Sequence, residues 1–196
     1  MNYQERHWKS KFGVKYTKRN KKIVKNLFIQ SVLKKIGKIH NVFEFGTNVG
    51  NNLDIIKRFN KKIETNGIEI NEFASKIAES KGHFIINGSV KKKIKTKKKF
   101  DLVFTSGLLI HISPKDLNKV YKNIFSLTKK YILIAEYFSQ EPVAINYRGK
   151  RNLLFKRDFA KELKRKFKLK IVDYGFIWSE DKKHNLDNFN WFILKK

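Results

Sequence analysis

The sequence contains no cysteine, so the chain can have no disulfide framework, no thiolate metal site and no cysteine nucleophile. Long apolar runs are also missing, because Lys or Asn interrupts each apolar segment before it reaches the length of a membrane span. Residues 1–12 lack the apolar core of a signal peptide. The histidines stand at positions 7, 40, 83, 111 and 184, without the spacing of metal ligands. We therefore expect a cytoplasmic protein with no membrane span and no bound metal, and the sequence leaves its oligomeric state open.

Arginine is scarce in a chain that is otherwise strongly basic. Of 45 basic residues only seven are Arg and the other 38 are Lys, and the formal net charge is +28. Proteins that read nucleic acids depend on the forked guanidinium of Arg, whereas these lysines are spread along the whole chain apart from one cluster over 91–99. A lysine-rich solvated surface is therefore the preferred interpretation, and a nucleic-acid partner stays open but is not favoured.

The length of 196 residues is enough for one domain with a full core and too short for two ordinary ones. We expect a single domain over 1–196, with an N-terminal lid or helix segment over 1–36 and an α/β core over 37–196. Hydrophobic periodicity predicts alternating strands and helices. The expected strands cover 41–45, 65–70, 83–87, 100–105 and 131–137, and the expected helices cover 20–36, 51–59, 72–80, a stretch from 114 capped by Ser113 and a stretch capped by Asp158.

Two further strands are expected near the end, separated by a polar hinge from Glu180 to Asn188. Residues 1–20 show no clear periodicity, and 138–154 has the composition of a loop. The pattern predicts a doubly wound, mostly parallel seven-stranded sheet with an antiparallel C-terminal hairpin strand.

A glycine turn joins the first expected strand to its helix, within the segment VFEFGTNVGNN. A dinucleotide fingerprint would require glycine at 46, 48 and 51, but the chain has Gly46, Asn48 and Asn51. The pattern of Glu44, Gly46 and Gly50 instead matches the E-x-G-x-x-x-G loop with which class I methyltransferases, a Rossmann-like group, hold S-adenosylmethionine. Asn48 replaces a frequent glycine, and asparagine tolerates the left-handed backbone that such a turn requires.

An acid follows at the end of the second expected strand, about 20 residues further on, where a Rossmann-like fold uses Glu or Asp to accept ribose hydroxyls. This acid is Glu69. Glu44 can orient the loop or face the positive end of the cofactor, and a buried acid paired with a lysine is the alternative. The segment after the third expected strand is where adenine is usually held, although an acid is common at the position of Ser89. The predicted cofactor-binding residues are Glu44, Gly46, Thr47, Asn48, Gly50, Glu69, Ile70, Gly88, Ser89, Val90, Thr105, Ser106 and Gly107.

His111 is the predicted catalytic residue. Methyl transfer needs little beyond positioning, because the sulfonium is already a potent donor, but a hydroxyl or amine acceptor can require a base. His111 lies just beyond the fourth expected strand and titrates near neutrality. The alternative is a histidine that leads the next helix and bonds to the backbone. Nearby, Thr105-Ser106-Gly107-Leu108 does not match the N/D-P-P-Y/F loop that holds an extruded adenine, which argues against a base-flipping aminomethyltransferase.

The chain resembles the pseudaminic acid biosynthesis-associated methylases, a class I methyltransferase group. The resemblance runs nearly end to end, through Trp8, Phe12, Gly13, Tyr16, Arg19 and Asn20, then EFGTNVGNNL, GIEIN, FDLVFTSGLLIHISPKDL, YILIAEY, YRG, LFKRDFA, VDYGF and WFIL. It implies an S-adenosylmethionine-dependent enzyme that methylates a sugar or sugar-nucleotide in nonulosonic acid and surface-glycan biosynthesis.

The predicted substrate-binding set has four residues, of which one ends the fifth expected strand and three follow it. A forked guanidinium suits a sugar carboxylate or phosphate, and a tyrosine can stack on a sugar face. For each of them a packed or surface side chain is the alternative. The N-terminal aromatic residues are expected to form a lid over the cofactor or to pack against the sheet. The substrate-binding candidates are Tyr137, Tyr147, Arg148 and Arg157.

Two other classes of function stay open at this stage. An RNA methyltransferase would use the lysine-rich surface to hold phosphates, and its binding would fall steeply with salt. A non-catalytic methyltransferase-like module would have a broken cofactor loop, whereas Gly46, Gly50 and Glu69 are intact.

Overall fold

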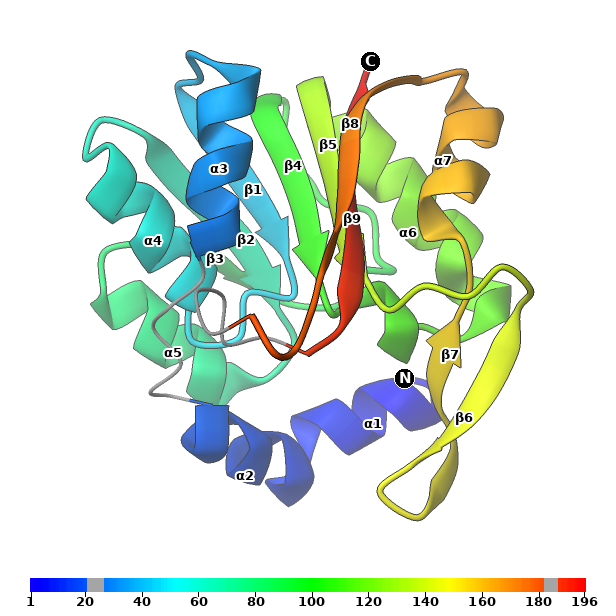
Figure 1. Ribbon diagram of the computed structural model, residues 1–196. Coiled ribbons are helices and arrows are strands. Elements are labelled where there is room, and N and C mark those ends of the chain that lie inside the picture. Colours follow the sequence, from blue (N-terminus) through cyan, green and yellow to red (C-terminus); the bar gives the residue numbers. More distant parts are fainter. Residues whose placement is uncertain (21–26, 182–186) are drawn as a thin grey trace.

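The computed structural model describes residues 1–20, 27–181 and 187–196, and a seven-stranded sheet lies at its centre (Figure 1). The strand order is β3-β2-β1-β4-β5-β9-β8. Strands β1 to β5 are parallel, while β9 pairs antiparallel with both β5 and β8. The predicted doubly wound, mostly parallel sheet with an antiparallel C-terminal hairpin strand is confirmed, and that strand is β9, next to the edge. The bounds are β1 Asn41–Phe45, β2 Glu64–Glu69, β3 Phe84–Asn87, β4 Phe100–Ser106, β5 Thr128–Glu136, β8 Lys170–Ile177 and β9 Phe189–Lys195.

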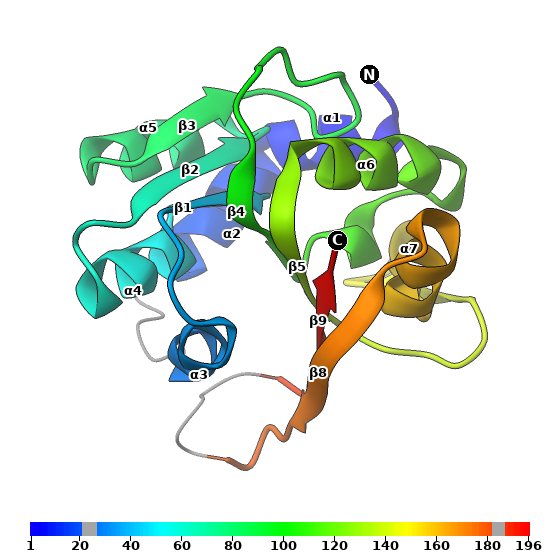
Figure 2. The same ribbon diagram turned by 90° about the horizontal axis from the view of Figure 1, so that it is seen from above.

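Helices cover both faces of this sheet (Figure 2). Helices α3 and α4 pack on one face and α6 and α7 on the other, while α5 contacts β2 and β3. The carboxyl ends of the five parallel strands therefore meet at one edge, where ligands bind in open α/β folds. Helices α1 and α2 lie across that edge (Figure 1). The bounds are α1 Tyr3–Lys9, α2 Lys11–Asn20, α3 Leu27–Ile36, α4 Asn51–Phe59, α5 Glu72–Ser80, α6 Pro114–Leu127 and α7 Phe159–Phe167.

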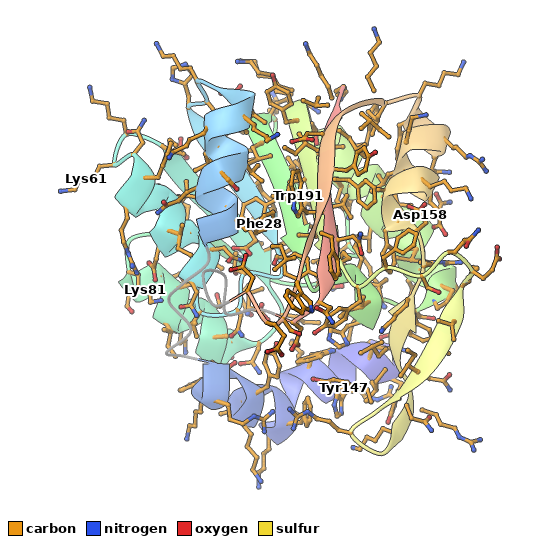
Figure 3. All side chains as sticks on the ribbon, in the orientation of Figure 1. Phe28, Lys61, Lys81, Tyr147, Asp158 and Trp191 are labelled. Carbon is orange, nitrogen blue, oxygen red and sulfur yellow. The ribbon has the colours of Figure 1, made fainter. Side chains whose placement is uncertain are left out.

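Alternate residues of the central strands are buried on opposite faces of the sheet. In β4, Val103 packs with α6 and α7, whereas Leu102 and Phe104 pack with α3 and α4. Burial on both faces explains why these strands have nearly continuous apolar sequences. On the α3 face, the ring of Trp191 from β9 lies 5.9 Å from the ring of Phe28 (Figure 3). Within the described residues, no helix has the length and apolar character needed to cross a membrane.

The N-terminal residues form the two helices α1 and α2, although residues 1–20 show no clear periodicity in the sequence. A capping box starts α1: the Asn2 side chain accepts from the backbone N–H of Glu5, and the Glu5 carboxylate accepts from the backbone N–H of Asn2, each at 3.0 Å. Asparagine takes the position usually held by Ser or Thr, which makes the signal weak in the sequence. The helix expected over 20–36 is described only from Leu27, since 21–26 lie outside the described residues.

A two-stranded hairpin forms within the segment 138–154, so the prediction of a loop there is wrong. Strands β6 Val143–Tyr147 and β7 Lys150–Lys156 pair antiparallel around a two-residue turn. Both turn residues, Arg148 and Gly149, have positive φ, at 50° and 74°. Such turns favour Asn-Gly, and an Arg in the first position gives no sequence signal.

Among the described residues, one of the two predicted N-cap side chains makes a capping hydrogen bond and the other does not. Asp158 caps α7 as predicted, because its carboxylate accepts from the backbone N–H of Lys161 at 2.8 Å. Ser113 precedes α6 as predicted, but among the described residues its side chain makes no capping hydrogen bond.

Strand β8 forms one edge of the sheet, and most of its side chains are exposed. Val172, Tyr174 and Phe176 are 45%, 66% and 58% exposed, and Trp178 just beyond the strand is 58% exposed. Only β9 pairs with β8 in the described part of the chain. The predicted polar hinge from Glu180 to Asn188 follows this strand, and its residues 182–186 lie outside the described residues.

Gly67 sets the closest contact between β2 and the turn that follows β1. A Cβ atom at this position would lie 2.2 Å from Cγ2 of Thr47 and 2.8 Å from the carbonyl oxygen of Glu44. We expect Gly67→Ala to lower the free energy of unfolding by about 1–3 kcal/mol through this overlap. Urea denaturation measures the change, with Gly88→Ala as the matched control, since the nearest atoms to a Cβ there are 3.8 Å away. Equal stability of the two variants would show that the turn yields at Thr47 without cost.

Candidate active site

A cavity of about 280 Å³ lies between the carboxyl edge of the sheet and helices α1 and α2. Eleven of the predicted cofactor-binding and catalytic residues line it, contributed by the ends of β1, β2 and β4 and by the segments that follow β1, β2, β3 and β4. They are Glu44, Gly46, Thr47, Asn48, Glu69, Ile70, Ser89, Val90, Ser106, Gly107 and His111.

The glycine turn between β1 and α4 forms one wall of this cavity. Gly46, Asn48 and Gly50 have φ angles of 76°, 48° and 77°, all in the left-handed region. Asparagine at 48 adopts the backbone that the sequence analysis expected of it. A Cβ on Gly46 would lie 2.8 Å from Cδ1 of Leu108, so only glycine allows the turn to approach the loop after β4.

Gly50 lies behind the turn and does not line the cavity. A Cβ there would lie 2.8 Å from Cδ2 of His83, whose Nε2 is 2.9 Å from Oδ1 of Asp54. Lys81 (labelled in Figure 3) completes this support: its ammonium donates to the carbonyl of Val49 and to Asp54, each at 2.7 Å. Gly50 therefore leaves room for the buried ring of His83 beside the start of α4, and the contacts of His83, Asp54 and Lys81 hold the turn from outside.

The Glu69 carboxylate ties the glycine turn to the end of β2. Its two oxygens accept from the backbone N–H of Asn48 and of Asn71, each at 2.8 Å. The residue is 8% exposed, and burial raises its pKa although the amides act in the opposite direction. Since each carboxylate oxygen has a second lone pair, Glu69 can also accept hydroxyl hydrogen bonds from a ligand in the cavity.

Glu44 is buried at the base of the cavity with one oxygen that lacks a partner. Its Oε1 accepts from the side-chain amide of Asn52 at 2.7 Å, and among the described residues Oε2 has no hydrogen-bond partner. Burial raises the pKa of Glu44 well above its ordinary value. The alternative of a lysine-paired structural acid does not match this contact. A donor from a ligand, above all a cationic one, would satisfy Oε2 and lower the pKa again.

His111 lines the cavity and is also bonded to the backbone. Its Nδ1 lies 2.7 Å from the carbonyl oxygen of Leu153, which can only accept, so Nδ1 carries the hydrogen and Nε2 is unprotonated in the neutral ring. Burial lowers the pKa of His111 to about 4. The rings of Trp8 and Tyr147 lie 4.6 Å and 5.3 Å from the imidazole. His111 is thus neutral and oriented at neutral pH, as a proton acceptor must be.

Three predicted cofactor-binding residues lie behind the cavity wall, not on it. Besides Gly50, these are Gly88 at the end of β3 and Thr105, which is fully buried within β4.

The predicted substrate-binding residues lie outside the cavity lining. Tyr147, at the hairpin end beside α1 (Figure 3), packs against His111 from behind. Arg148 stacks over Tyr147 in the turn, and Tyr137 donates to Asp187 at 2.5 Å. Arg157 forms a 2.9 Å ion pair with Glu162 of α7. The sequence spacing after β5 did not reveal that the chain forms the β6–β7 hairpin here, with β7 packed against the segment Leu109–His111.

Helices α1 and α2 supply residues that the sequence analysis did not select. Gln4, Glu5, Trp8, Tyr16 and Thr17 line the cavity from these helices. Thr17 donates to the Asn48 side chain at 3.1 Å, and the carbonyl of Trp8 accepts from the Asn71 amide at 2.9 Å. Helices α1 and α2 face the cavity and also contact the loops at the edge of the sheet. This arrangement has features of the lid expected for the N-terminal aromatic residues and of the alternative, in which they pack against the sheet.

Glu136, at the end of β5, is a further residue that the sequence analysis missed. Its carboxylate accepts from the backbone N–H groups of Leu108, Leu109 and Ile110, at 3.1, 3.0 and 3.4 Å. Burial raises the pKa of Glu136 to about 7. A glutamate at or next to the end of a buried apolar strand occurs at Glu44, Glu69 and Glu136 alike, and this shared signal could have identified it.

No family model matches the chain, and no curated protein matches it in sequence. Its fold is similar to that of magnesium protoporphyrin IX methyltransferase from Synechocystis PCC 6803, solved with bound S-adenosylhomocysteine: the TM-score is 0.70 at 12% identity, over 98% of this chain and 97% of that chain. It is also similar to 1,6-didemethyltoxoflavin-N1-methyltransferase from Burkholderia thailandensis, with a TM-score of 0.73 at 16% identity, over 96% and 86% of the two chains. An S-adenosylmethionine-dependent methyltransferase from Clostridium acetobutylicum ATCC 824 gives 0.66 at 14% identity, over 94% and 97%.

These similarities extend over nearly the whole of each chain. The protein therefore has the Rossmann-like fold of the class I methyltransferases. The first two of these proteins are named for different substrates and the third for none, so the shared fold leaves the methyl acceptor open.

Titration of Glu136 makes stability depend on pH in a defined window. Because its pKa in the folded state is about 7 and its ordinary value is 4.5, the folded state binds more protons than the unfolded state between these values. This carboxyl therefore lowers the free energy of unfolding as pH rises from 4.5 to 7, by up to about 1.4 kcal/mol per pH unit. Glu136→Gln should remove this dependence, so its stability relative to the wild type should increase across the window.

Urea denaturation at several pH values measures this difference. The exposed Glu141→Gln reports the effect of removing one surface carboxylate. A difference between Glu136→Gln and the wild type that stays constant from pH 4.5 to 7 would contradict the assignment.

Proposed function

We propose that the protein is a methyltransferase that uses S-adenosylmethionine, and the observation that carries the proposal is the charge of the cavity. Three carboxylates, Glu5, Glu44 and Glu69, line it, and among the described lining residues Lys91 is the one cationic side chain. Lys91 is itself paired with Glu5 at 3.1 Å and with Asp116 at 3.2 Å. In a chain of net charge +28, this site is suited to a cationic ligand.

That charge distinguishes two cofactors that the Rossmann-like fold accommodates. A dinucleotide brings a pyrophosphate, and among the described lining residues the one cationic side chain, Lys91, is already paired with Glu5 and Asp116. S-adenosylmethionine brings a sulfonium, an ammonium and a carboxylate, together with ribose hydroxyls and adenine. The site residues fit this group: Glu44 offers an unpartnered buried oxygen, the glycine turn allows close backbone approach, and Glu69 has lone pairs for the ribose hydroxyls.

We propose the following roles for the protein groups. The turn from Gly46 to Asn48 and Glu44 would hold the amino-acid part of the cofactor, Glu69 the ribose, and Ser89 with Val90 the adenine. When bound, the cofactor supplies an activated methyl group. Beside it, the unprotonated Nε2 of His111 would accept the proton that a hydroxyl or amine acceptor loses as its new bond to the methyl carbon forms.

For the acceptor we propose a sugar or sugar-nucleotide, in surface-glycan biosynthesis of the pseudaminic acid type. The resemblance given by the sequence supports this class. The aromatic side chains of Trp8 and Tyr16, which line the cavity near His111, also support it, since sugar rings bind against aromatic faces while their hydroxyls bond to polar groups. An RNA acceptor is less favoured because the cavity lining lacks unpaired cations among the described residues.

The cofactor assignment is tested by calorimetric titration with S-adenosylhomocysteine, with NAD as the control ligand. We expect micromolar binding of S-adenosylhomocysteine and no binding of NAD. Glu69→Ala should weaken the binding by about 1–3 kcal/mol, the scale of a lost charge-assisted hydrogen bond. Glu72→Ala, three residues away and exposed, is the matched control and should leave the affinity unchanged. Binding of NAD, or of neither ligand, would contradict the proposal.

The role of His111 is tested by turnover with sugar-nucleotide acceptors. His111→Ala should lower kcat by about 10²–10⁴-fold while the dissociation constant of S-adenosylhomocysteine stays nearly the same. Since the pKa of His111 is about 4, the wild-type kcat should stay level from pH 6 to 8 instead of rising through the ordinary histidine value of 6.5. Full activity of the variant would leave His111 with a structural role.

The acceptor class is tested by competition. Methyl transfer to a sugar-nucleotide should be unaffected by added RNA. Inhibition by RNA that declines steeply with salt, together with methylation of the RNA, would favour the nucleic-acid acceptor instead.

A further inference from the structure

The loop after β3 lacks the acid expected beside an adenine. Its residues Asn87, Gly88, Ser89 and Val90 carry no carboxylate, and the Asn87 amide already donates to the carbonyl of Glu69 at 3.1 Å. The exocyclic amine of adenine is a donor that must lose its water when it enters a cavity, and an unpaired donor there is costly. An acceptor has to come from another part of the chain.

Helix α1 brings a carboxylate to this position. Glu5 lines the cavity together with Ser89 and Val90, and the Ser89 hydroxyl donates to its Oε1. Its Oε2 accepts from the backbone N–H of Asn2 at 3.0 Å and lies 3.1 Å from the ammonium of Lys91. Burial acts to raise the pKa of Glu5, but the contacts of Ser89, Asn2 and Lys91 outweigh it and lower the pKa, so the group is ionised at neutral pH.

The lone pairs of this carboxylate are not exhausted. Oε1 receives one hydrogen bond, from Ser89, and an ionised carboxylate oxygen accepts two. Oε2 is occupied by Asn2 and Lys91, which fix the orientation of the group. Glu5 therefore presents one fixed acceptor at the place where the loop after β3 has none.

We propose that Glu5 accepts the exocyclic amine of the cofactor's adenine, so that the N-terminal helix contributes the acid that the core lacks. The inference rests on the proposed function, because it places S-adenosylmethionine in the cavity. It also gives Glu5 a role beyond the capping box, in which a glutamate at this position needs no ligand.

One consequence is that cofactor binding and docking of α1 are coupled. Helix α1 is also held on the core by residues that do not line the cavity: Asp116 accepts from the side-chain amide of the N-cap residue Asn2 at 2.8 Å, and the carbonyl of Asn152 accepts from the Gln4 amide at 2.9 Å. A ligand that contacts Glu5 binds better to the docked state than to an undocked one, and so it shifts the population toward docking.

The experiment compares two ligands that differ by one group. Isothermal calorimetry measures the dissociation constants of S-adenosylhomocysteine and of its purine analogue, in which a hydrogen replaces the exocyclic amine. For the wild type we expect the purine analogue to bind about 10-fold to 100-fold more weakly, the loss of one hydrogen bond to a charged group. In Glu5→Ala this ratio should fall to about one, because both ligands then lack the contact.

Asp116→Asn is the matched control, since Asp116 holds α1 through Asn2 and Lys91 but does not line the cavity. This variant should weaken the binding of both ligands equally, so that the ratio of their dissociation constants stays at the wild-type value. Any of three results would overturn the proposal. The ratio of dissociation constants could be near one in the wild type, it could be unchanged in Glu5→Ala, or it could fall equally in both variants. If the wild type binds neither ligand, the proposed function itself fails, and this outcome is distinct from the others.

Amide hydrogen exchange over residues 3–9 provides a second readout that needs no substitution. S-adenosylhomocysteine should protect these amides more than the purine analogue does at equal saturation of the site. Equal protection by the two ligands would contradict the coupling.

Discussion

The carboxylate of Glu69 is the contact on which the arrangement of the site depends. It joins two loops that leave neighbouring parallel strands, because one oxygen receives the amide of Asn48 and the other the amide of Asn71. Asn71 in turn caps α5 and donates to the carbonyl of Trp8. One buried acid thus sets the glycine turn, the start of α5 and, through one more bond, the position of the N-terminal helices.

The parts of the site that could be predicted from the sequence are those fixed by local backbone geometry. The glycine turn, the strand that precedes it and the acid at the end of β2 lie within 30 residues of one another, and each has a residue type that its backbone position demands. The sheet could be predicted for a similar reason, since burial on both faces gives its strands continuous apolar sequences.

The parts that could not be predicted depend on contacts between distant segments. Glu5 and Ser89 are 84 positions apart, and the support of His111 by the Leu153 carbonyl spans 42 positions. The β6–β7 hairpin turns at Arg148, a residue with no preference for positive φ, and so this hairpin has no signal in the sequence. The lysine excess gave no guidance either, because Lys91 is the one lysine among the described residues that line the cavity.

The lysine excess also affects how closely the β8 edges of two molecules approach each other in solution. In the described part of the chain one side of β8 has no partner strand, and such an edge, with exposed Tyr174 and Phe176 and with Trp178 just beyond it, is a surface on which copies of a chain can associate. Mutual repulsion between molecules of charge +28 opposes that encounter, but it extends only about 10 Å at 0.1 M salt and about 3 Å at 1 M. The ionic strength of the solution therefore decides how near two such edges approach, and dilute buffer, in which the repulsion reaches furthest, is the medium in which the molecules stay apart.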